Sequence, residues 1–352
     1  MVQVLPRQRA GQASRKSAAI AEQLLNFSSL RSSVVALCFT GFKQCAMISH
    51  VSSLKQFIRE SPEVRSRFAE LFPKPEFISR TLLVPCPVKY SPQQASLVGT
   101  AFDYLLRFYA HHLNLPIANA RRWVAEAAVN SLEEDATESQ GFHFHEQCAK
   151  DAVKARQLLA DAKQHFSNYL AIGNMSDALF RSVLNLATLD PIMRAGTGEE
   201  MIGLINERDT QDLKRLIQAV DESRFKAKSL CLLNPIFCES PDFVIGADAD
   251  LVLDDVIIDI KTTELCRLNR SDLDQLIGYF LLNEIVGFTT VTAKPLVSKV
   301  GIYFSRHAYF YIIPIRQLIN DRNLADLLTW FKDRLIEYSP QDLDWTPPRN
   351  IS

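Results

Sequence analysis

The sequence predicts an α+β or α/β fold in which a helical N-terminal half precedes a core that contains strands. Apolar residues recur at helical spacing in the first half, and one such stripe comprises Phe102, Leu105, Leu106, Tyr109 and Leu113. The composition changes at Cys231, after which residues 243–260 and 296–314 are short runs rich in Val, Ile, Phe and Tyr. Such runs are typical of strands, so the second half should contain a sheet.

The order of the expected elements supports this fold class. In the first half, further helical patterns cover residues 51–71, 117–132, 146–171, 176–188 and 210–227. In the second half, helical segments at residues 272–285 and 316–338 alternate with the strand-like runs. The order strand, strand, helix, strand, strand, helix predicts an α/β core on which the earlier helices must pack.

Four segments are expected along the chain. Residues 1–46 are basic and polar at first and only weakly apolar later, so they should form a loosely attached extension, and Met47 is a second candidate for the start of the protein. Residues 47–230 form the mainly helical region, residues 231–340 form the core, and residues 341–352 form a Pro-rich tail.

Composition and charge indicate an ordinary globular protein. Of the 352 residues, 47% are hydrophobic and 22% are charged, which is enough apolar material for a packed core. The formal net charge of −1 gives no general attraction to nucleic acid, so nucleic-acid binding must rest on a local basic patch. Seven cysteines without a CxxC pair favour a reducing, cytoplasmic environment over a disulfide framework. No apolar run reaches the roughly 18 residues that a membrane-spanning helix needs.

Residues 246–261 (GADADLVLDDVIIDIK) contain the most informative pattern in the chain. Two apolar runs, residues 251–253 and 256–258, flank Asp254 and Asp255. Short apolar runs on either side of two turn-forming residues predict a β-hairpin with a two-residue turn. Position 253 then pairs with position 256, position 252 with 257 and position 251 with 258.

Continuing this pairing places Asp250 opposite Asp259 and Asp248 opposite Lys261. Because side chains alternate between the faces of a strand, all four should project to one side. Two carboxylates with Cβ atoms about 5 Å apart repel each other unless a cation lies between them. Mg²⁺ prefers oxygen ligands and typically binds one or two carboxylates, while Lys261 can hold or activate a water molecule. Carboxylate pair, divalent metal and lysine together suit in-line attack on a phosphodiester.

This order of residues resembles the PD-(D/E)xK nuclease superfamily, in which an acidic residue on one strand is followed by (D/E)-x-K on the next strand. Asp250 matches the first position, and Asp259, Ile260 and Lys261 match the second. The RecB-like branch of the superfamily adds Q-x-x-x-Y on the following helix, and residues 275–279 (QLIGY) match that motif. The resemblance implies a restriction-endonuclease-like core with a central mixed sheet flanked by helices.

The resemblance also implies the roles of the site residues. The implied catalytic residues are Asp250, Asp259, Lys261, Gln275 and Tyr279. The two aspartates would bind Mg²⁺ or Mn²⁺ together with the backbone carbonyl of Ile260, the lysine would position the attacking water, and the glutamine and tyrosine would orient the substrate. Some RecB-like nucleases hold an iron–sulfur cluster through one upstream and three downstream cysteines, but only Cys266 follows Lys261 here, so no such cluster is expected.

Several other residues have both a functional and a plain structural interpretation. The superfamily often places a histidine or an acidic residue upstream of the hairpin, and Asp103 is the candidate metal or water ligand here, with Glu239 a weaker one. The structural alternative is that Asp103 pairs with Arg107, four residues later on one helix. Asp248 is either a further metal ligand or, as we favour, an ion-pair partner of Lys261.

Two further groups are less specific. His143, His145 and Cys148 have the residue types of a zinc site, but no partner pair stands at ligand spacing, so the start of a solvated helix is preferred. Arg267 and Arg270 flank the site and either hold phosphates or lie in a solvated loop.

The sequence therefore predicts a Mg²⁺-dependent nuclease that hydrolyses DNA, with a role in repair, recombination or defence against foreign DNA. DNA is the expected partner, and a helicase would have to come from a separate chain, because no helicase motif is present. The alternative is a catalytically inactive nucleic-acid-binding or scaffolding protein that retains the nuclease fold. The intact Asp259-Ile260-Lys261 motif argues against it. A helical interaction module with an unrelated β subdomain is the third interpretation, and it predicts no metal binding.

Overall fold

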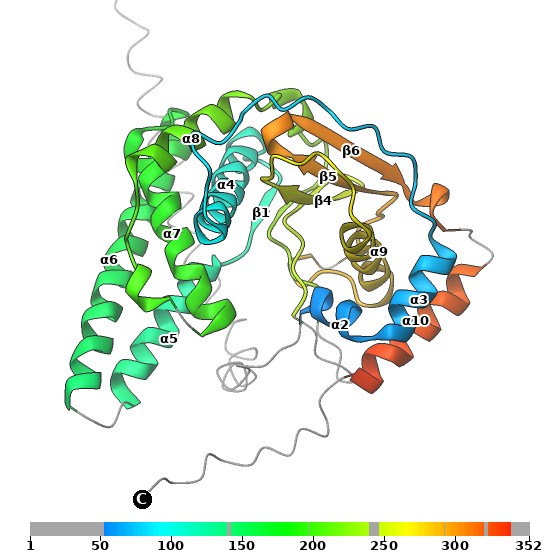
Figure 1. Ribbon diagram of the computed structural model, residues 1–352, viewed down its shortest axis with the longest axis horizontal. Coiled ribbons are helices and arrows are strands. Elements are labelled where there is room, and N and C mark those ends of the chain that lie inside the picture. The colour runs from blue at the N-terminus through cyan, green and yellow to red at the C-terminus, as the bar shows by residue number, and fades with distance from the viewer. Residues whose placement is uncertain are drawn as a thin grey trace, which may run out of the picture. The chain divides into compact units, whose positions relative to one another are not determined.

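The computed structural model describes residues 53–138, 142–196, 198–238, 246–291, 293–319 and 323–338. The expected N-terminal extension and the Pro-rich tail lie outside these ranges. The chain from Val51 onward forms one compact unit, which contains both the helices of the first half and the sheet (Figure 1). Within the described ranges, no helix has both the length and the apolar character that crossing a membrane requires.

A six-stranded mixed sheet lies between the helices of this unit. Its strands, in both spatial and chain order, are β1 Ala118–Ala120, β2 Cys231–Leu233, β3 Leu251–Leu253, β4 Val256–Lys261, β5 Lys299–Phe304 and β6 Tyr309–Pro314. The β1–β2 and β4–β5 pairs are parallel, and the other neighbouring strands are antiparallel. This sheet confirms the mixed α/β class that the sequence predicts.

The described part of the chain contains nine α-helices, several of which begin at a residue whose side chain caps them. They are α2 Leu54–Glu60, α3 Pro62–Leu71, α4 Pro92–Leu113, α5 Val124–Glu138, α6 Phe142–Ile172, α7 Asp177–Ala195, α8 Glu207–Gln218, α9 Arg270–Ile285 and α10 Leu324–Tyr338. Ser53, Ser61 and Ser91 each accept a backbone N–H of the first turn through the side-chain hydroxyl. Pro62 and Pro92 follow two of these caps, at a position where the missing N–H removes no helical hydrogen bond.

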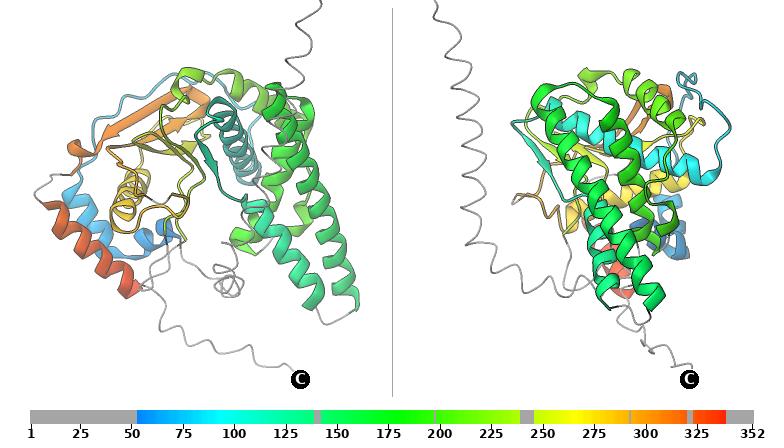
Figure 2. Two further views of the ribbon diagram at one scale, coloured as in Figure 1. Left: turned by 180° about the vertical axis from the view of Figure 1, so that it is seen from behind. Right: turned by 90° about the vertical axis from the view of Figure 1, so that its left-hand side faces the viewer.

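Different helices cover the two faces of the sheet, as Figures 1 and 2 show. Leu251 and Ile258 pack in the core cluster that includes helices α4 to α8. Ile257 packs in the other core cluster, with α2, α3, α9 and α10. Because neighbouring residues of a strand face opposite sides, Asp259 and Lys261 belong to the same face as Ile257, the face that α9 covers.

Helix α9 connects the parallel strands β4 and β5, which a tight hairpin cannot do. Gly278 lies in this helix at the point where α2 approaches it. A Cβ atom at Gly278 would lie 3.0 Å from a terminal carbon of Leu54 and 3.1 Å from one of Ile58. The missing side chain therefore allows α2 to pack closely against α9.

The structure differs from the predicted elements in several places. The helix expected over residues 210–227 ends at Gln218, and the helix expected over residues 316–338 begins only at Leu324. The helix expected over residues 117–132 is in fact the short strand β1 followed by α5, because three residues pair with β2 before the helix begins. The helix expected over residues 176–188 continues past Pro191 and stops at Gly196, whose φ of 63° is left-handed.

Candidate functional site

The β3–β4 hairpin has the predicted register. Its pairs are Leu251 with Ile258, Val252 with Ile257 and Leu253 with Val256. Asp254, the first residue of the turn, has a φ of 51°, which aspartate adopts more readily than most residues. The ladder starts at Leu251, so Asp250 lies one residue before it, and the Asp250 carbonyl accepts a hydrogen bond from the Asn234 N–H at 3.0 Å.

Asp250 lies beside the end of β4, as the pairing predicts. The Ile260 N–H donates to Asp250 Oδ2 at 2.7 Å. The N–H and the C=O of one strand residue point to the same edge of the strand, so the Ile260 carbonyl also lies toward Asp250. Two of the expected metal-binding groups are therefore neighbours.

Asp259 and Lys261 contact each other on the α9 face of the sheet. Lys261 Nζ lies 2.8 Å from Asp259 Oδ2 and 3.8 Å from Asp272 Oδ1, and Asp259 is only 4% exposed. Burial lowers the pKa of Lys261, but the Asp259 carboxylate and then Asp272 raise it by more, so the pKa is raised and the amine stays protonated.

The expected ion pair between Asp248 and Lys261 is wrong. Asp248 Oδ2 lies instead 3.3 Å from Arg194 Nη2, which comes from helix α7. The reason is that the chain leaves the hairpin ladder before Leu251, and Asp248 forms an isolated antiparallel bridge with Ile236. The pairing pattern therefore cannot be extended as far back as position 248.

Asp250 and Asp259 lie at the end of the hairpin opposite the turn, here called the open end. Their carboxylates lie in an unfavourable environment. Burial raises the pKa of Asp250 well above its ordinary value, and the nearby charges of Asp103 and Asp259 raise it further. Burial also raises the pKa of Asp259, against the opposing effect of Lys261. Asp103 Oδ1 is a buried oxygen that accepts no hydrogen bond within the described part of the chain, and the only partner of Asp259 Oδ2 there is Lys261 Nζ, 2.8 Å away. An acceptor without a donor, such as Asp103 Oδ1, is costly to bury, and a bound cation would satisfy it.

Asp103 reaches the site from α4 and combines both of the interpretations considered for it. Its Oδ2 pairs with Arg107 at 2.6 Å, which is the structural alternative. Its Oδ1 remains without a donor, and its charge acts on Asp250. Burial raises the pKa of Asp103 to about 6, although Arg107 opposes that shift. The weaker upstream candidate, Glu239, lies outside the described residues.

Gln275 and Tyr279 lie one turn apart on α9 and contact each other. Gln275 Nε2 donates to the Tyr279 hydroxyl at 2.6 Å, while Gln275 Oε1 has no donor within the described ranges. Tyr279 is 4% exposed and stacks on Phe237, with ring centroids 5.6 Å apart. Burial raises the pKa of Tyr279, and the Asp259 and Asp250 charges add to the effect. Tyr279 is therefore buried near the Asp250 and Asp259 carboxylates, where its hydroxyl holds the Gln275 side chain in place.

The remaining candidates lie elsewhere or are structural. Arg270 donates to the backbone carbonyls of Phe68 and Phe72 and pairs with Asp274, so it fastens α9 to α3. Arg267 is exposed. Residues 143–148 form the first turns of α6, as a helix start was expected there.

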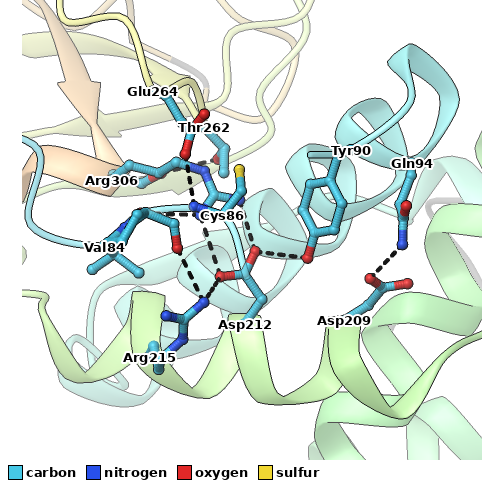
Figure 3. Close-up of polar contacts among 12 residues, drawn as sticks. Val84, Cys86, Tyr90, Gln94, Asp209, Asp212, Arg215, Thr262, Glu264 and Arg306 are labelled. Atoms are coloured by element: carbon cyan, nitrogen blue, oxygen red, sulfur yellow. Dashed lines mark hydrogen bonds and ion pairs between the residues drawn. The ribbon is translucent and has the colours of Figure 1, made fainter. Parts of the chain in front are cut away.

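A buried polar cluster that the sequence does not reveal lies next to the site (Figure 3). Arg306 donates to both carboxylate oxygens of Asp212, at 3.2 and 2.7 Å, and Tyr90 and Arg215 donate to the same carboxylate. Ser305, beside Arg306, donates to the Lys261 carbonyl at 3.4 Å. Both oxygens of Asp212 thus have donors, so the cluster supports the end of β4 rather than offering a binding group.

The donor set of the site suits a sparsely ligated metal. Within the described ranges, no three or more His, Cys, Asp or Glu side chains are arranged to hold an ion by themselves. Mg²⁺ does not require such a cage, because water and substrate phosphate complete its shell around one or two carboxylates. Asp250, Asp259 and the Ile260 carbonyl fit that requirement.

No family model, no curated protein and no solved structure matches this chain. The resemblance to the PD-(D/E)xK superfamily therefore depends on the motif residues and their geometry.

Proposed function

We propose that this protein is a metal-dependent deoxyribonuclease with a PD-(D/E)xK core of the RecB-like type. The observation that carries the proposal is the convergence of Asp250, Asp259 and Lys261 at one end of a single hairpin, with Gln275 and Tyr279 on the crossover helix. A surface hairpin with incidental charges would leave its acidic groups solvated. Here the two aspartates have raised pKa values, mainly because of burial.

Each residue has a role that follows from its surroundings. Asp250, Asp259 and the Ile260 carbonyl would hold one Mg²⁺ or Mn²⁺. Such an ion supplies positive charge at the scissile phosphate and promotes deprotonation of a water molecule. Lys261 is protonated, so it donates hydrogen bonds to the attacking water or to a phosphate oxygen and does not accept the proton. The free Oε1 of Gln275 can accept a hydrogen bond from water or substrate.

The first prediction concerns Lys261→Ala. We expect Mg²⁺-dependent cleavage of DNA by the wild type and a loss of about 100-fold or more in the variant, since a charged donor at the reacting phosphate is removed. The measurement uses circular and linear DNA, single- and double-stranded, each with Mg²⁺, Mn²⁺ or chelator. Circular dichroism checks that the variant is folded.

Lys226→Ala is the matched control, because Lys226 is an exposed lysine that pairs with Glu222 on the surface. It should cut at the wild-type rate. Wild-type cleavage by Lys261→Ala would show that the lysine assignment is wrong. Binding of DNA without any metal-dependent cleavage by the wild type would favour the alternative, an inactive nucleic-acid-binding protein that keeps the fold.

A further inference from the structure

Helix α2 is anchored beside the candidate active site at two points. Ser53, its N-cap, forms a parallel bridge with Gly246, at the start of the segment that leads to Asp250. Leu54 packs directly on Gly278, one residue before Tyr279, because the glycine has no side chain there. The anchors Ser53 and Leu54 directly precede Lys55 in sequence, so they hold the backbone of Lys55 beside the site.

Lys55 is an exposed cation without an ion-pair partner in the part of the chain that the structure describes. The first turn of α2 contains no acidic residue. The charge of Lys55 nevertheless acts to lower the pKa of the buried Asp259 carboxyl group, as the charge of Lys261 does. The other nearby cations are already engaged: Arg107 pairs with Asp103, and Arg194 pairs with two carboxylates.

We infer that Lys55 binds a backbone phosphate of the DNA next to the one that is cleaved. The inference rests on the proposed nuclease function and adds a substrate-binding residue to it. A lysine ammonium on a flexible stem is a point charge that suits phosphate. Contacts to phosphate fix the position of the DNA but carry no sequence information. Lys55 therefore contributes affinity that is independent of base sequence and depends on salt.

The test compares Lys55→Ala with the wild type in steady-state cleavage of a labelled 30-nucleotide DNA, single-stranded and duplex, at several salt concentrations. Loss of one phosphate contact lowers the slope of log affinity against log salt by about 0.9, which near 0.1 M salt amounts to about eightfold in affinity. We expect KM to rise by about that factor with kcat unchanged, as for removal of uniform binding.

Lys55→Arg should restore the wild-type KM, because it keeps the charge. Arg59→Ala is the control on the same helix, since Arg59 is exposed and pairs with Glu60. An unchanged KM and salt slope in Lys55→Ala, or a fall in kcat alone, would overturn the inference.

Fluorescence anisotropy with the same DNA in Ca²⁺ separates this inference from the nuclease proposal. If the wild type binds DNA through Lys55 but does not cut it, the nuclease proposal fails and the phosphate-binding role stands. If cutting occurs and Lys55→Ala binds as tightly as the wild type, only the role of Lys55 fails. Absence of DNA binding would overturn both.

Discussion

The two ends of the β3–β4 hairpin carry aspartate pairs with opposite properties. At the turn, the Asp254 carboxylate accepts hydrogen bonds from the backbone N–H groups of residues 228–230. Burial acts to raise the pKa of Asp254, but these donors outweigh it, and the pKa is lowered. Asp255 likewise has a lowered pKa, because Ser298 and Lys299 outweigh its burial.

At the open end the balance is reversed. Asp250 accepts one backbone hydrogen bond, and Asp259 has one cationic neighbour within 3 Å, yet burial keeps both pKa values raised. The residue type and the hairpin are the same at both ends. The number of hydrogen-bond donors and cations around each carboxyl group determines whether its charged form is stabilised by the fold. At the end with few donors, a bound metal ion would stabilise the charged carboxylates instead.

The largest effect should come from Asp250→Asn. The asparagine carbonyl can still accept the Ile260 N–H, while the charge next to Asp259 and Asp103 is removed. In chelator the variant should be at least as stable as the wild type, yet its DNA cleavage should fall by about 100-fold or more. Mg²⁺ at 100 times its Kd should stabilise the wild type by about 2.7 kcal/mol and the variant much less.

Thermal melts of both proteins with chelator and with Mg²⁺ measure this difference, and Asp326→Asn, at an exposed site on α10, serves as the charge-matched control. If Mg²⁺ raises the melting temperature equally in Asp250→Asn and the wild type, Asp250 is not a ligand. If Asp250→Asn is destabilised in chelator as well, the open end is a structural ion-pair cluster.

An intermediate effect is expected at the turn, from Asp254→Gly. Glycine keeps the left-handed φ of 51° without strain, so the substitution removes only the acceptor of the backbone hydrogen bonds. The free energy of unfolding should fall by about 1–2 kcal/mol, measured by denaturant titration. Cleavage per folded molecule should stay at the wild-type value. A large loss of activity in Asp254→Gly protein that is fully folded would show that the open end of the hairpin depends on the turn.

The smallest effect concerns pH. A carboxyl with a raised folded pKa contributes stability that is fully present below its unfolded pKa and is lost as pH rises through the folded pKa, which for Asp103 is about 6. In chelator, the wild type should therefore gain stability relative to Asp103→Asn, on the order of 1 kcal/mol, as pH falls from about 7 to about 5. Denaturant titrations of both proteins at each pH test this. A constant difference would mean that Asp103 does not titrate in this pH range.

Local chemistry made the hairpin predictable. Two apolar triplets around Asp254 and Asp255 permit a single register with both faces buried, so the placement of Asp250 beside β4 follows from the sequence. The partner of Asp248 could not be predicted, because the point where the chain leaves the ladder depends on Ile236, whose segment has no strand pattern of its own.

Three other features depended on tertiary structure alone. Strand β1, Ala118–Ala120, contains no β-branched residue and exists only by pairing with β2. The Arg306–Asp212 pair joins residues 94 positions apart, and no local pattern marks either partner. The position of Lys55 also depends on a contact, that of Leu54 with Gly278, between segments distant in the chain.

The Arg306–Asp212 pair has a consequence for how the sequence can evolve. Both side chains are at most 2% exposed. Losing Asp212 alone would leave the Arg306 charge unpaired in the interior, at a cost of about 3–5 kcal/mol, whereas losing Arg306 alone leaves Asp212 with Arg215 and Tyr90. Selection should therefore remove substitutions of Asp212 more strongly than substitutions of Arg306. Among descendants of this chain, position 306 should vary before position 212 does.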